Sequence, residues 1–180
     1  MKKIQITSHL LALFFRLLCF LIPLATTYLL FFNLQAMLSW GFFDHIISPG
    51  KVQHPEQFST AHRFILLGIS SLPMSISVFI CHKLSQLFKR FEQGELFEEA
   101  HVKLVKQIGL CMISSELIQL IYQPLITAAL TFSNGPGERI ASITLGKANG
   151  TTIITALILL VVSWIIKEAQ QLKVESQLTI

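Results

Sequence analysis

Four long apolar runs dominate the sequence and limit what the chain can fold into. They cover about residues 12–36, 64–82, 104–132 and 151–166. An α-helix rises about 1.5 Å per residue, so about 20 apolar residues cross the roughly 30 Å of hydrocarbon in a bilayer. The fourth run is shorter than this but contains no charged residue. The four runs therefore predict four transmembrane helices.

The composition excludes a soluble or disordered chain. Apolar residues make up 52% of the 180 residues and charged residues only 13%, whereas a typical soluble domain carries about 25% charge. A disordered chain would be rich in charge and poor in Leu, Ile and Phe. We therefore expect one all-α integral membrane domain over residues 1–180, folded as a four-helix bundle.

Basic residues are unevenly divided between the two sides of the membrane. The termini and the connection between the second and third runs hold eight Lys or Arg, and the other two connections hold four. Because positive residues are retained in the cytoplasm, we expect both termini, the linker at residues 83–103 and the tail at residues 167–180 to be cytoplasmic. The fourth helix is predicted to extend into this tail and to end near Ser176.

The linker is predicted to be amphipathic and helical. Its apolar residues recur at helical spacing at Leu84, Leu87, Phe88 and Phe91, which is typical of a helix that leaves the bilayer and lies at its surface. Gly94 is suited to the left-handed conformation that ends a helix. A second helix is predicted to start near Leu96, with Glu98 and Glu99 in its first turn, where the helix dipole favours anions.

Two interpretations of this linker stay open. The acidic residues are either a solvated helix start or part of a surface that docks a partner. The candidate surface comprises Phe91, Gly94, Phe97, Glu98 and Glu99.

Glu116 is the main candidate for function within the bilayer, because an ionisable group inside a span costs several kcal/mol unless it is protonated or paired. At 100° per residue, Glu116, Gln119 and Gln123 fall on one polar stripe. The stripe is either a relay or substrate-contact line, or a buried carboxylic acid that is hydrogen-bonded to a neighbouring helix. A weaker hypothesis pairs Glu116 with Arg16.

The two outer connections give weaker signals. His45, His54 and His62 share the first one, but their spacing matches no tight metal-ligand pair, and we interpret them as ordinary loop histidines rather than a metal site. In the second connection, residues 138–145 are predicted to be either a short strand or a short helix. No Gly-rich phosphate loop or CxxC motif is present, so we expect no enzyme, metal or cofactor.

Two segments carry a resemblance to a known family. The linker sequence FEQGELFEEAHVKLVKQIG at residues 91–109 and the ending KEAQQLKVESQLTI at residues 167–180 resemble the corresponding segments of small bacterial four-span proteins, the domain of unknown function 2975 family. The resemblance covers nearly the whole chain. It implies an integral protein of the bacterial inner membrane with unknown activity, in some cases associated with small helix-turn-helix regulators. It supplies no catalytic residues.

Two functional hypotheses follow from these observations. The first is a non-enzymatic regulator, sensor or partner-binding membrane anchor that acts through the linker and tail. Besides the lipid bilayer, its expected partner is a cytoplasmic protein or a second copy of the chain, with no direct contact to nucleic acid. The second is a small transporter or proton-coupled channel subunit that uses the carboxylate of Glu116.

Overall fold

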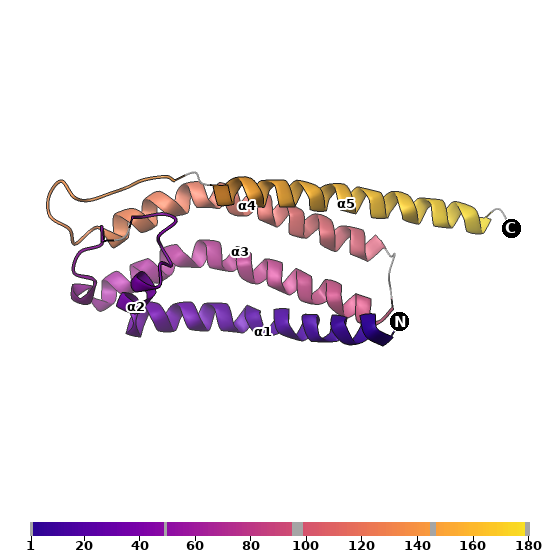
Figure 1. The fold of residues 1–180 in the computed structure, drawn as a ribbon, viewed down its shortest axis with the longest axis horizontal. Helices are drawn as coiled ribbons and strands as arrows, with labels where there is room; N and C mark the ends of the chain where they lie inside the picture. Colours follow the sequence, from indigo (N-terminus) through magenta and orange to yellow (C-terminus); the bar gives the residue numbers. More distant parts are fainter. Residues whose placement is uncertain (1, 49, 95–98, 145–146, 179–180) are drawn as a thin grey trace. The chain divides into compact units, whose positions relative to one another are not determined.

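Long α-helices make up most of the chain. The computed structural model describes residues 2–48, 50–94, 99–144 and 147–178, and this part contains helices and no strand (Figure 1). In chain order the helical elements are α1 (Lys2–Phe32), α2 (Leu34–Ser39), the 3₁₀ turn η1 (Pro55–Gln57), α3 (Thr60–Glu92), α4 (Glu99–Leu130) and α5 (Lys147–Leu178). The all-α prediction is confirmed.

Four of these helices have the length and composition of membrane spans, as predicted. The apolar helical stretches are Ile4–Phe32, Thr60–Glu92, Glu99–Leu130 and Asn149–Leu172. Large apolar side chains on them are exposed, for example Phe20 at 72% and Phe32 at 79%. Such surfaces are costly in water, whereas hydrocarbon solvates them, so these helices are those of a multi-pass membrane protein.

The linker differs in one respect from the expectation. Residues 83–92 do not form a separate surface helix but continue α3 without a break to Glu92. No Gly or Pro interrupts the sequence between Pro73 and Gly94, so the helix has no reason to stop earlier. At the other end of the chain α5 runs to Leu178, close to the predicted end at Ser176.

The structure divides into two compact units, and each long helix contributes to both. Unit 1 comprises Met1–Phe20, Ser77–Ser114 and Gly150–Ile180. Its buried core is formed by Leu87, Leu104, Val105 and Ile108. These side chains come from the last turns of α3 and the first turns of α4, so the core of unit 1 fixes the two helix ends that flank the linker.

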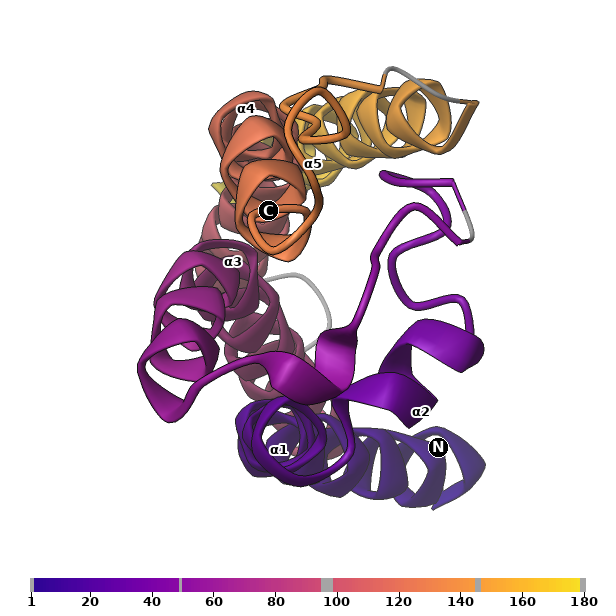
Figure 2. The same ribbon diagram turned by 90° about the vertical axis from the view of Figure 1, so that its left-hand side faces the viewer.

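Unit 2 comprises Leu21–Ile76 and Ser115–Asn149. Its larger core includes buried residues of α1, α2, α3 and α4 and of the first outer connection, among them Leu30, Met37, Phe43, Leu66 and Ile126. Figure 2 shows this connection, in purple, folded into turns between α2 and the start of α3.

An arginine closes the end of α1 in unit 2. The guanidinium of Arg63 donates a hydrogen bond to the backbone carbonyl of Phe31, one of the carbonyls that a helix leaves unpaired at its C-terminus. A cation also suits the negative end of the helix dipole. Arg63, one of the four basic residues of the outer connections, therefore has a structural role.

Candidate functional site

A row of polar side chains follows one face of α4 in unit 2. Gln123, Thr127 and Thr131 are all buried and lie four residues apart, so they lie above one another on the helix. Their side chains accept hydrogen bonds from backbone N–H groups of the segment that follows α4. Ile140 N donates to Thr131 Oγ1 at 2.9 Å, Ser142 N to Thr127 Oγ1 at 3.1 Å and Thr144 N to Gln123 Oε1 at 2.6 Å.

The regular spacing of these bonds has a simple geometric origin. Four residues of α-helix advance about 6.0 Å, and two residues of extended chain advance about 6.6 Å. Every second N–H of the extended segment therefore meets the side chain one turn further along α4. Figure 1 shows the segment, in orange, running back beside α4.

This pairing settles the conformation of the second outer connection. Residues 138–144 are extended and belong to no helix, and of the two alternatives the strand-like one is closer, although the partner is a row of helix side chains. Residue 145 lies outside the described part of the chain. Buried backbone N–H groups need partners, and the α4 side chains supply them.

The threonine hydroxyls donate as well as accept. Thr127 Oγ1 donates to the carbonyl of Gln123 at 2.7 Å, and Thr131 Oγ1 donates to the carbonyl of Thr127 at 2.8 Å. The Thr127 hydroxyl thus donates within α4 and offers a lone pair to the extended segment, whereas the Thr131 hydroxyl also lies 3.2 Å from the carbonyl oxygen of Ile140 in that segment. This row is a satisfied structural network.

Glu116 continues the row toward the start of α5. Its Oε2 accepts a hydrogen bond of 2.5 Å from Nδ2 of Asn149. Gln119 lies between Glu116 and Gln123, and its buried Oε1 has no hydrogen-bond partner among the residues that the structure describes. The structure therefore gives a partner to two of the three residues of the predicted polar stripe. Arg16 belongs to unit 1, where its side chain is exposed.

Aromatic rings pack around the end of α3 in unit 1. Phe91 stacks on His101 with ring centroids 4.9 Å apart, and Phe88 stacks on Phe15 at 5.7 Å. Gly94 has the predicted left-handed conformation, with φ of +82°. Two residues of the candidate partner surface, Phe97 and Glu98, lie outside the described residues.

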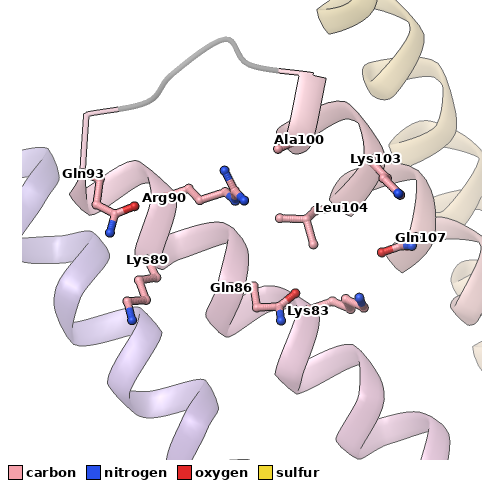
Figure 3. Close-up of a pocket in the computed structure, with 9 residues that line it drawn as sticks. All are labelled: Lys83, Gln86, Lys89, Arg90, Gln93, Ala100, Lys103, Leu104 and Gln107. Carbon is pink, nitrogen blue, oxygen red and sulfur yellow. The ribbon is translucent and has the colours of Figure 1, made fainter.

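A basic pocket lies between the ends of α3 and α4, in unit 1. Its volume is about 590 Å³, and Figure 3 shows its lining. The lining residues are Lys83, Gln86, Lys89, Arg90, Gln93, Ala100, Lys103, Leu104 and Gln107. Four of the nine carry positive charge and none carries negative charge.

Nearby carboxylates among the described residues have other surroundings. Glu92 Oε1 lies 3.0 Å from Nδ1 of His9, and it lines a separate pocket with that histidine. Glu99, the first residue of α4, lines a third pocket, which also contains Lys106 and Lys167 and shares Ala100 and Lys103 with the basic pocket. Among the described residues, the lining of the basic pocket itself contains cations and no carboxylate.

This pocket was not predicted from the sequence, although its four cations lie on the side with the larger number of basic residues. Four of the five lining residues from the end of α3 follow the helical spacing i, i+3, i+7, i+10 from Lys83, with Lys89 off this spacing, and those of α4 follow i, i+3, i+4, i+7 from Ala100. Each set therefore lies on one helix face. This helical periodicity of polar residues was the feature of the sequence that could have indicated the pocket.

Two of the three outer histidines, His54 and His62, have local partners. His62 Nε2 donates to the carbonyl of Ala129 at 2.7 Å, and its ring stacks on Phe58 at 4.2 Å. His54 Nδ1 lies 3.2 Å from Glu56 Oε1. The backbone amide of Glu56 and the His54 side chain lower the pKa of the Glu56 carboxyl. The described residues contain no group of three His, Cys, Asp or Glu that could hold a metal ion.

The fold and these sites define an all-α, multi-pass membrane protein with basic residues at the ends of α3 and α4 that flank the linker. The chain belongs to the family described as "Protein of unknown function (DUF2975)", whose model matches residues 14–180. The resemblance inferred from the linker and the tail is thereby confirmed. No curated protein and no solved structure matches the chain.

Proposed function

We propose that the protein is a non-enzymatic membrane anchor that binds a cytoplasmic partner through the linker end of α3 and α4, and acts as a regulator or sensor. The observation that carries this proposal is the basic pocket, which is concave, rich in cations and positioned by the buried core of unit 1. Such a surface attracts acidic partners.

The distribution of charge supports the proposed orientation. The side that holds the linker has eight Lys or Arg and the other side has four, so the linker and both termini face the cytoplasm. The membrane that we propose is a bacterial inner membrane. The partner is a cytoplasmic protein or a second copy of the chain.

The alternative function is a transporter or proton-coupled channel subunit that uses Glu116. The buried Oε1 of Gln119 favours it, because an unengaged acceptor on the same face is a potential contact for a substrate or ion. The hydrogen bonds of Glu116 to Asn149 and of Gln123 to Thr144 favour the anchor instead, because they engage both residues in holding the second outer connection and the start of α5.

Site-specific photocrosslinking in living cells tests the proposal. A photoreactive residue would replace Gln86 or Gln93, both exposed on the linker end of α3, and matched controls would carry it at exposed Ser133 or Glu138 in unit 2. We expect a discrete protein adduct at the linker positions only. An adduct of twice the chain mass identifies a second copy as the partner.

The same experiment in the Glu116→Gln background separates the two functions. An anchor keeps its adduct, because the glutamine still accepts from Asn149. Absence of protein adducts at both linker positions, or equal adducts at the control positions, contradicts the anchor.

A further inference from the structure

We propose that the basic pocket between α3 and α4 binds a phosphate group, carried by the headgroup of an anionic lipid or by a soluble phosphate ester. The proposal goes beyond the proposed function because it assigns a ligand. It shares with that function only the cytoplasmic placement of the linker, and the binding itself does not depend on a protein partner.

The first argument is the convergence of donors from two helices. In Figure 3, Lys83 and Arg90 extend from α3 toward α4, whereas Lys89 points away from α4. Lys103 supplies a cation from α4. An Arg fork can bind two phosphate oxygens at once, and lysines add point charges.

The second argument is electrostatic. Like charges that face each other across a concave surface raise the local potential, and this effect is strongest where the walls have a low dielectric constant. Buried Leu104 and the apolar core behind it provide such a wall. Glu92 lines a separate pocket, and Glu99 lines the neighbouring pocket that shares Lys103 with this one. A phosphate would interact favourably with the positive potential of this lining.

The third argument concerns the chemistry and size of the pocket. Its amides, Gln93 and Gln107, can donate to phosphate oxygens, and Ala100 and Leu104 offer an apolar patch to a glycerol backbone. A volume of about 590 Å³ lies in the usual range for small-molecule sites. Basic pockets between membrane helices at the cytoplasmic side suit anionic headgroups.

Binding measurements on the full-length protein in mild detergent test this inference. Native mass spectrometry would compare phosphatidylglycerol, phosphatidylcholine and glycerol phosphate as probes, with adduct intensity and melting temperature as readouts. We expect an adduct and a raised melting temperature with phosphatidylglycerol or glycerol phosphate, and neither with phosphatidylcholine. Binding of phosphatidylglycerol alone identifies a lipid as the source, and binding of glycerol phosphate identifies a soluble ester.

Matched variants assign the binding to the pocket. Arg90→Gln and Lys103→Gln should each weaken binding about fivefold, which corresponds to about 1 kcal/mol for one cation near a membrane surface. Arg90→Lys should retain much of it. Lys106→Gln removes the same charge from an exposed position on α4 that lines a different pocket, and it should bind as the unmodified protein does.

Two results would overturn the inference. One is the absence of binding by both phosphate probes. The other is equal weakening by Lys106→Gln and Lys103→Gln, because general attraction to a basic protein would then explain the signal. Exposed Lys103 serves as the main test site, so that a folding defect in Arg90→Gln does not decide the outcome.

Discussion

Asn149, in the first turn of α5, donates a 2.5 Å hydrogen bond from Nδ2 to Oε2 of Glu116 in the middle of α4. The two residues are separated by 33 positions and both belong to unit 2. The bond continues the row in which Gln123, Thr127 and Thr131 hold the extended segment at residues 138–144. Glu116, whose carboxylate lies within an apolar run of the sequence, thus has a hydrogen-bond partner in the structure.

The first prediction concerns this bond. Glu116→Gln keeps an acceptor for Asn149 and should leave the melting temperature in detergent nearly unchanged. Glu116→Leu removes the acceptor, and we expect a loss of about 1–3 kcal/mol in the free energy of unfolding, because a polar donor loses its partner. Equal stability of the two variants would show that the bond does not contribute.

The second prediction concerns the row of threonines. Thr127→Val removes the acceptor of Ser142 N, so it should cost about 1 kcal/mol and speed hydrogen exchange at Ser142. Thr127→Ser should restore protection. Thr155→Val is the control, because the exposed hydroxyl of Thr155 donates to the carbonyl of Thr151 in its own helix. Faster exchange at Ser142 in the control would contradict a specific ladder.

The third prediction concerns Gly94, which has φ of +82°, and an added Cβ there would meet no atom of the described residues within 4 Å apart from its chain neighbours. Any effect of substitution there comes from the backbone conformation. Gly94→Val should destabilise by about 1 kcal/mol or more, since β-branched residues resist the left-handed region, and Gly94→Asn should be milder. Protease nicking of the linker provides the measurement, and indistinguishable nicking of the two variants would argue against a left-handed Gly94.

The fourth prediction concerns the contact between α4 and α5 in unit 1. A Cβ added at Gly109 would lie 3.2 Å from the carbonyl oxygen of Ala156 and 3.2 Å from a methyl carbon of Leu160. Gly109→Leu should therefore push the helices apart and lower stability by about 1–3 kcal/mol. Gly68→Leu is the control, because an added Cβ there meets nothing within 4 Å. A melting temperature as low in the control as in Gly109→Leu would refute close packing at Gly109.

Periodicity and length were sufficient to predict the helices from the sequence. Leucine-rich runs specify spans by their hydropathy alone, and the polar residues after Trp164 still favour a helix, so the end of α5 was also predictable. The residue at which α3 ends was harder to predict. A surface helix and a continued span share the pattern of Leu84, Leu87 and Phe88. Only tertiary packing distinguishes them, and here Leu84 and Leu87 pack with residues of α4 while Phe88 stacks on Phe15 of α1.

The candidate site was predictable only in part. Glu116 was conspicuous because a carboxylate in an apolar run is rare. Its partner Asn149 was not, because it lies beyond a connection whose path depends on side-chain acceptors at Thr127 and Thr131. The basic pocket also requires a face of α3 to meet a face of α4. The periodicity of each face can be read from the sequence, but the pairing of the two faces cannot.

The orientation of the linker is the central claim, and cysteine labelling tests it most directly. Single cysteines would replace exposed Ser48, Gln93, Pro136 and Gln171 in a chain whose native Cys19, Cys81 and Cys111 are changed to serine. An impermeant thiol reagent would be applied to intact and to permeabilised cells. We predict labelling of Ser48 and Pro136 positions in intact cells, and of Gln93 and Gln171 positions only after permeabilisation. Labelling at position 93 in intact cells would place the basic pocket outside the cytoplasm and contradict the account.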